Sequence, residues 1–187
     1  MLLSVTLVGV RSNAFARCLL LSIVFLVAGR CNLAAQVTAT IAETSTTPGI
    51  EIAIPLTVSN LTGKDVRSFE FVVSCDTAVA SLTGVSQQKT LSEGLAMYAN
   101  NKVAPFNRGR MKVVCASAKP LAGQGILVNL LVTVGKRAGS SPLAISDFMM
   151  NTGMPGVKTH SGSLVSRPAD PTKAKMQRNR PNLQRTK

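Results

Sequence analysis

The sequence predicts an all-β domain, a two-sheet jelly-roll sandwich of about nine short strands. Apolar residues recur at every second position in one segment after another, which is the period of a strand with one buried face. Turn-forming residues separate these segments at intervals of about eight to twelve residues, and no segment has the pattern of an amphipathic helix. This spacing favours a sandwich or jelly roll over a fold that alternates helices and strands.

The clearest candidate for a central strand lies within residues 66–85, VRSFEFVVSCDTAVASLTGV. Its apolar side chains occupy every second position up to Cys75, after which Asp76 and Thr77 break the alternation. An apolar pattern then resumes at Val79. The segment therefore predicts a buried strand, a tight corner, and a second short strand that carries the chain away.

Two strands are expected before the central one. Residues 37–41 alternate in polarity, and residues 50–59, IEIAIPLTVS, give the cleanest alternation in the chain. The turns TSTTPG at 44–49 and NLTGKD at 60–65 bound the second of these strands. Because Pro55 has no N–H to donate, its strand is expected to be an edge at that point, or to turn Pro55 toward a side without a hydrogen-bonded neighbour.

Several strands are expected after the central one. They are LAMYAN at 95–100, RMKVVCAS at 110–117, ILVNLLVTVGK at 126–136, LAISDF at 143–148 and SGSLVS at 161–166. The segment 126–136 is long enough for a helix, but its valine content and the flanking Gly125 and Gly135 favour a strand. The stretch between the last two strands gives only a weak signal.

Residues 1–35 have the composition of a signal peptide. Two arginines precede the apolar run 18–29, and Ala35 marks the expected cleavage site. The run is too short to span a bilayer comfortably, which disfavours a membrane anchor. A lipoprotein anchor at Cys31 is disfavoured because Arg30 stands where a small residue is expected. We expect an exported protein, extracellular or periplasmic, with no stable membrane insertion after cleavage.

The net charge of +13 is concentrated at the two ends of the chain. Residues 36–166, the expected sandwich, hold eleven Lys or Arg against seven acids, whereas residues 167–187 hold seven bases and one acid. The last segment has few apolar residues and is predicted to be a disordered basic tail. Such a tail can meet nucleic acid, anionic lipid or acidic polysaccharide through charge alone. A solvated linker is the simpler interpretation, and no specific nucleic-acid binding is expected.

Cys75 and Cys115 are the only cysteines that remain after cleavage, and an exported protein meets an oxidising environment. Both are expected on the apolar face of neighbouring strands, so a disulfide between them is predicted. It would close a loop of about forty residues. The alternative is two free, buried thiols that pack as small apolar side chains.

The predicted sandwich contains no recognisable catalytic or metal site. Hydrolysis needs a pair of positioned carboxylates, or a nucleophile with a base, and the seven acids are scattered over strands and turns. The single histidine, His160, has no Cys or acid at ligand spacing and is interpreted as a surface residue. No phosphate-binding Gly-Lys loop, HExxH helix or CxxC pair occurs. The sequence therefore predicts a non-catalytic protein with no cofactor and no metal.

The order of the segments gives a more specific indication. TPGIEIAIPLTVSNL is followed by VRSFEFVVSCDTAVASLTGV, by RMKVVCASAKPLAGQGILVNLLVTV and by a late Gly-Ser-Leu-Val strand. This succession, from about Val37 to Ser166, resembles the cohesin family and the related superfamily of carbohydrate-binding modules. The resemblance implies a nine-stranded jelly roll that binds a dockerin module through one sheet, which includes the third, fifth, sixth and eighth strands.

The same resemblance places the partner-binding face on the strands at 66–75 and 110–117. Its outward residues there are Ser68, Glu70, Val72, Lys112, Val114 and Ala116, with Ser117 at the strand end. From alternation alone, the two valines and the alanine are expected to form an exposed apolar stripe with a polar surround. Cohesins commonly carry Asn and Asp near Ser68 and Glu70 and an acid near Ser117, so this chain keeps one of those three features.

The predicted function is therefore a secreted binding or scaffolding module of the cohesin kind, with a dockerin-type protein partner. The chain lacks the calcium-loop repeats of a dockerin, so it would be the receptor. A polysaccharide-binding module is the alternative, because the superfamily includes such modules. Flat sugar-binding surfaces usually use stacked aromatic rings, and this chain has no Trp and one Tyr, Tyr98. That composition favours a protein partner.

Overall fold

The described chain begins and ends with strands that cross from one sheet to the other. The computed structural model describes residues 36–168, and the predicted signal peptide and most of the predicted tail lie outside them. Strand β1 (Val37–Ile41) belongs to a five-stranded sheet, and β2 (Thr44–Thr46) belongs to a six-stranded sheet. The last strands, β10 (Val157–His160) and β11 (Gly162–Ser166), change sheets in the same way and run parallel to β1 and β2, respectively.

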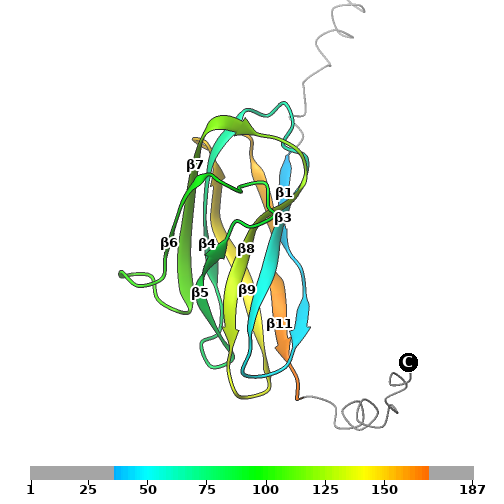
Figure 1. Cartoon of the computed structure of the whole chain (residues 1–187), viewed down its shortest axis with the longest axis vertical. Coiled ribbons are helices and arrows are strands. Elements are labelled where there is room, and N and C mark those ends of the chain that lie inside the picture. Colours follow the sequence, from blue (N-terminus) through cyan, green and yellow to red (C-terminus); the bar gives the residue numbers. More distant parts are fainter. Residues whose placement is uncertain (1–35, 169–187) are drawn as a thin grey trace, which may run out of the picture. The chain divides into compact units, whose positions relative to one another are not determined.

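Seven strands lie between these end strands and complete two sheets that lie face to face (Figure 1). They are β3 (Glu51–Val58), β4 (Val66–Ser74), β5 (Ala80–Ser86), β6 (Ala96–Asn100), β7 (Arg110–Leu121), β8 (Gly125–Val134) and β9 (Gly139–Met150). The five-stranded sheet has the order β10-β1-β3-β8-β5, and the six-stranded sheet has the order β2-β11-β9-β4-β7-β6. The predicted all-β sandwich is confirmed.

Residues 36–168 form eleven strands, where the sequence predicts about nine. The two extra strands are β2 and β10, of three and four residues. Strands this short carry too few alternations to be recognised, and β2 falls in a segment whose Thr, Pro and Gly residues are typical of a turn. The segment 126–136 contributes to strand β8 and forms no helix, as predicted.

Pro55 lies in β3 at a position where only one neighbouring strand is present. The ladder between β3 and β1 ends at the pair Leu56 and Ile41, because β1 then leaves for the other sheet. On its other side Pro55 lies opposite Asn129 of β8. This register makes β3 a local edge at the proline, which confirms the prediction.

The core lies between the two sheets and has an aromatic centre. Phe69 and Phe71 of β4 are fully buried, and their stacked rings have centroids 6.2 Å apart. Phe71 also stacks on Phe148 of β9, at 5.3 Å. Side chains of the five-stranded sheet, such as Ile54 and Leu130, belong to the same core. The six-stranded sheet thus buries one face, and its other face is available for contact.

Gly162 lies where the first and last strands change sheets. A Cβ atom at this position would come within 2.6 Å of the carbonyl oxygen of Ile41 and 2.7 Å of that of Ala42. Because backbone atoms cannot swing away, we expect Gly162→Ala to lower the free energy of unfolding by about 1–3 kcal/mol. Thermal unfolding measures this change. In the matched control Gly156→Ala, the new Cβ meets nothing within 4 Å, and equal losses of Tm would contradict the interpretation.

Candidate functional site

Strand register places four side chains in one row across the six-stranded sheet. Glu70 of β4 lies opposite Met149 of β9 on one side and opposite Val114 of β7 on the other. Val114 in turn lies opposite Tyr98 of β6. Three of these side chains are exposed and largely apolar, with exposed fractions of 65% for Tyr98, 38% for Met149 and 36% for Val114. We call these four residues the central row.

Two further rows flank the central row, and the three rows together form what we call the four-strand face. One flanking row contains Ser146, Val72, Lys112 and Asn100, from β9, β4, β7 and β6. The other contains Ser68, Ala116 and Ala96, from β4, β7 and β6. Apart from Val72, the flanking residues are polar or small, so the large apolar side chains concentrate in the central row.

Six of the seven predicted partner-binding residues lie on the four-strand face. The expected exposed apolar stripe is wrong in one member, because Val72 is only 4% exposed. The physical reason is the position of β4 inside the sheet, where Lys112 of β7 and Ser146 of β9 lie on either side of this short side chain. Val114 and Ala116 are exposed, as predicted.

The seventh predicted residue, Ser117, does not join the others on the face. It has the parity of the inward-facing Val113 and Cys115. Its hydroxyl donates to the carbonyl oxygen of Lys119 and accepts a hydrogen bond from the Lys119 N–H at 3.1 Å. Local backbone bonds therefore occupy this side chain.

An ion pair neutralises the charge in the middle of the face. Lys112 Nζ lies 3.1 Å from a carboxylate oxygen of Glu70, and both side chains are about one-third exposed. An exposed pair of this kind contributes on the order of 0–1 kcal/mol to stability. Because the Lys112 ammonium neutralises the Glu70 carboxylate, a partner that binds the central row meets no net charge there.

Tyr98 and Met149 belong to the central row but are not among the predicted partner-binding residues. The signal for Tyr98 was its alternate position in LAMYAN, which becomes informative only once β6 is paired with β7. Met149 could not be placed by alternation, because β9 contains a bulge. Its register with β4 shifts between Glu70 and Val72, and Asp147 has a φ of 53°.

Asn151, in the turn after β9, fixes one end of the face. Its side-chain oxygen accepts hydrogen bonds from the backbone N–H groups of Arg67, at 2.8 Å, and Ser68, at 3.2 Å. Its Nδ2 donates to the carbonyl oxygens of Asp65, at 3.1 Å, and Met154, at 3.0 Å. These bonds tie the β9–β10 turn to the start of β4, beside a depression of about 80 Å³ at the central row.

The predicted disulfide between Cys75 and Cys115 is not formed, and both thiols are free. Cys115 lies opposite Phe69, whereas Cys75 lies six residues beyond Phe69, where its N–H donates to the carbonyl oxygen of Gly109. Six residues of strand span about 20 Å, and a disulfide requires Cα atoms within about 7 Å. The two thiols occupy distant positions along the same pair of strands, which alternation alone does not reveal.

Burial raises the pKa of both thiols from 9.0 to about 11. Between these pH values the unfolded chain loses protons that the folded chain keeps, so the free energy of unfolding is expected to fall as the pH rises. In thermal unfolding, a Cys75→Ala, Cys115→Ala double variant should lose less Tm over this range than the parent. Equal losses of Tm would contradict this expectation. Free thiols should also react with iodoacetamide in denaturant without reductant, and a failure to react would contradict it as well.

Within residues 36–168, no group of three or more His, Cys, Asp or Glu side chains is placed to hold a metal ion. His160 is exposed at the end of β10, where it pairs with Thr40. In the described part of the chain, no helix has the length and apolar character needed to cross a membrane.

Comparison with protein families identifies the architecture that carries this face. Residues 37–164 match the family model described as Cohesin domain. The chain belongs to the cohesin family. The resemblance seen in the sequence is thereby confirmed over nearly all described residues of this cohesin. No curated protein matches the chain.

Solved cohesin structures share the fold of this cohesin. The non-cellulosomal cohesin of the hyperthermophilic archaeon Archaeoglobus fulgidus has a TM-score of 0.59 and 17% identity, over 78% of this chain and 99% of that one. CaCohA2 of Clostridium acetobutylicum has a TM-score of 0.62 and 17% identity, over 73% and 94%. The sixth cohesin of scaffoldin B from Acetivibrio cellulolyticus has values of 0.59 and 18%, over 71% and 100%. Identities this low show the fold alone.

Proposed function

We propose that this cohesin is an exported, non-catalytic scaffolding module that binds a dockerin-type protein through the four-strand face. Support for the partner class comes from related cohesins. The Acetivibrio cellulolyticus cohesin was solved in complex with the Cel5 dockerin, CaCohA2 in complex with CaDoc0917, and Coh-OlpA of Clostridium thermocellum in complex with Doc918.

The central row is the observation that carries the proposal. Six large apolar side chains are exposed in the described chain, and Tyr98, Val114 and Met149 are three of them. They come from three strands and are brought together only by sheet register. Contiguous apolar surface marks contact sites, and interface cores are apolar with a polar rim. The Ser, Asn and Lys side chains of the flanking rows supply such a rim.

The same face is poorly suited to a polysaccharide platform. Sugar rings stack on aligned aromatic side chains, and Tyr98 is the one exposed aromatic side chain in residues 36–168. Phe69 and Phe71 are buried in the core, and Phe106 lies under the guanidinium of Arg110 in a loop. A protein surface supplies apolar area without repeated rings, so it fits the face better.

Export is proposed from the leader sequence alone. Residues 1–35 lie outside the described residues. The charged start, the apolar run and the small residues before Gln36 support a signal peptide. N-terminal sequencing of the protein recovered from the culture medium or periplasm tests this part. A start near Gln36 is expected, and retention of the whole leader would contradict it.

Capture experiments test the proposed partner. The immobilised full chain is offered dockerin modules from its own source organism in calcium-containing buffer, since dockerins carry calcium loops. In parallel, the chain is run on affinity gels that contain neutral polysaccharides. We expect capture of at least one dockerin and no retardation on the gels. Retardation without any dockerin capture would reverse the assignment in favour of a carbohydrate-binding module.

A further inference from the structure

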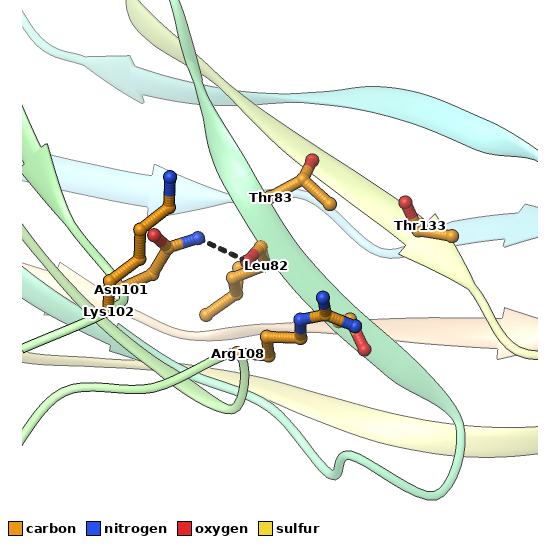
Figure 2. A pocket seen from close by; sticks show the side chains of 7 residues that line it. Leu82, Thr83, Asn101, Lys102, Arg108 and Thr133 are labelled. Atoms are coloured by element: carbon orange, nitrogen blue, oxygen red, sulfur yellow. Dashed lines mark hydrogen bonds between the residues drawn. The ribbon is translucent and has the colours of Figure 1, made fainter.

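A second candidate site lies at the edge of the five-stranded sheet, outside the four-strand face. A cavity of about 360 Å³ opens there at the edge strand β5. Strands β5 and β8 contribute hydroxyl side chains, and the β6–β7 loop contributes an amide and two cations (Figure 2). These residues are Ser81, Thr83, Thr133, Asn101, Lys102 and Arg108. A cavity of this size falls in the range of small-molecule sites.

Hydrogen bonds hold the β6–β7 loop against β5. The N–H of Leu82 donates to the carbonyl oxygen of Arg108 at 2.7 Å. The Nδ2 of Asn101 donates back to the carbonyl oxygen of Leu82 at 2.8 Å, as Figure 2 shows. Asn107 and Arg110 close the loop with a β-bridge. The side of the cavity that carries the cations is therefore built into the fold.

The two cations of this cavity form no ion pair within the described residues. Within residues 36–168, neither the ammonium of Lys102 nor the guanidinium of Arg108 makes an ion pair or a side-chain hydrogen bond. The carboxylate of Glu51 lies beside the cavity, where it accepts a hydrogen bond from the Thr83 hydroxyl at 3.1 Å. Glu51 forms no ion pair with either cation. The cavity thus presents positive charge beside hydroxyl groups.

We propose that this cavity binds an anionic sugar unit, with its carboxylate or sulfate on Lys102 and Arg108 and its hydroxyl groups on the Ser and Thr side chains. Cations favour an oxyanion through charge-assisted hydrogen bonds. A polyol ring accounts for the volume, which exceeds what a bare inorganic anion fills, and for the hydroxyl and amide lining. No aromatic side chain lines the cavity, which disfavours neutral sugars that bind by stacking.

Titration of the full chain with trigalacturonate, followed by amide NMR, tests the proposal. Saturable shifts are expected at Thr83 and Thr133. The substitutions Arg108→Gln and Lys102→Gln should each weaken binding by about tenfold, because each removes a charge-assisted hydrogen bond. Lys119→Gln and Lys158→Gln are the matched controls, since both side chains are exposed and lie outside the cavity. They should change the affinity by less than about twofold.

Titration with other ligands shows which anion the cavity binds and whether it needs the sugar ring. Binding of a sulfated disaccharide in place of the uronate would support the site and identify sulfate as its anion. Three results would overturn the proposal: equal binding of neutral xylotriose, equal binding of inorganic sulfate, or equal weakening by the control substitutions. Dockerin capture should be unchanged in Arg108→Gln, so failure of this proposal and failure of the proposed function are distinguishable.

Discussion

Replacing Val114 by Asp is expected to weaken dockerin capture by at least about 100-fold and to leave the fold intact. Val114 lies in the middle of the central row, directly opposite Glu70 on one strand and Tyr98 on the other. A bound partner would bury the new carboxylate beside that of Glu70, and the nearby cation, Lys112, is already paired with Glu70. Burial of an unpaired charge costs several kcal/mol, and about 2.7 kcal/mol corresponds to 100-fold.

Ile50→Asp is the matched control for this substitution. Ile50 has a similar exposed fraction, 42%, but it precedes β3 in the five-stranded sheet. Surface plasmon resonance gives the affinities of both variants, and circular dichroism with thermal unfolding verifies their fold. The control should bind like the parent. A folded Val114→Asp variant with undiminished affinity would show that the partner contacts another surface.

Among the substitutions proposed, Phe71→Ala is expected to lower the free energy of unfolding most, by about 3–5 kcal/mol. The side chain is fully buried, and its ring stacks on Phe69 and on Phe148. Truncation removes both contacts and leaves a cavity between the sheets that close packing cannot refill. For a domain of this size, the loss corresponds to a decrease in Tm of about 10–20 °C. Thermal and denaturant unfolding measure it.

The half-buried Phe106, in the β6–β7 loop, provides the comparison. Its ring contacts the guanidinium of Arg110, at 5.7 Å from the centroid, and it is not part of the core cluster. Phe106→Ala should cost less than about 1.5 kcal/mol. If Phe71→Ala and Phe106→Ala lowered the free energy of unfolding equally, the stacked rings of the core would not stabilise the fold more than the Phe106 ring does.

Alternation in the sequence predicts which side of a strand is buried. Phe71 and Cys115, both predicted to lie on an apolar face, are buried. Alternation gives no information on what lies beside an outward residue, and for that reason it misses the burial of Val72 inside the sheet. It also cannot measure separation along a strand. Cys75 and Cys115 have the same predicted face but occupy distant positions, so the predicted disulfide is wrong.

The candidate site could be predicted only in part, because register assembles it. The sequence predicts that Glu70 and Val114 lie on the partner-binding face, whereas Tyr98 joins them only through the pairing of β6 with β7. The place of Met149 on the face depends on a bulge, which changes the alternation of β9 without a clear signal in the sequence. The second cavity depends on a loop that returns over β5 to bond Leu82. A local pattern in the sequence does not reveal such contacts between distant segments.

The proposed function requires the partner to bind across the central row. NMR of the chain with labelled methyl groups and Tyr ring, titrated with the captured dockerin, tests it most directly. The largest shifts are expected at the methyl groups of Val114 and Met149 and at the ring of Tyr98, with the methyl groups of Ile50 unaffected. Shifts confined to the five-stranded sheet, with these three side chains unchanged, would contradict the claim.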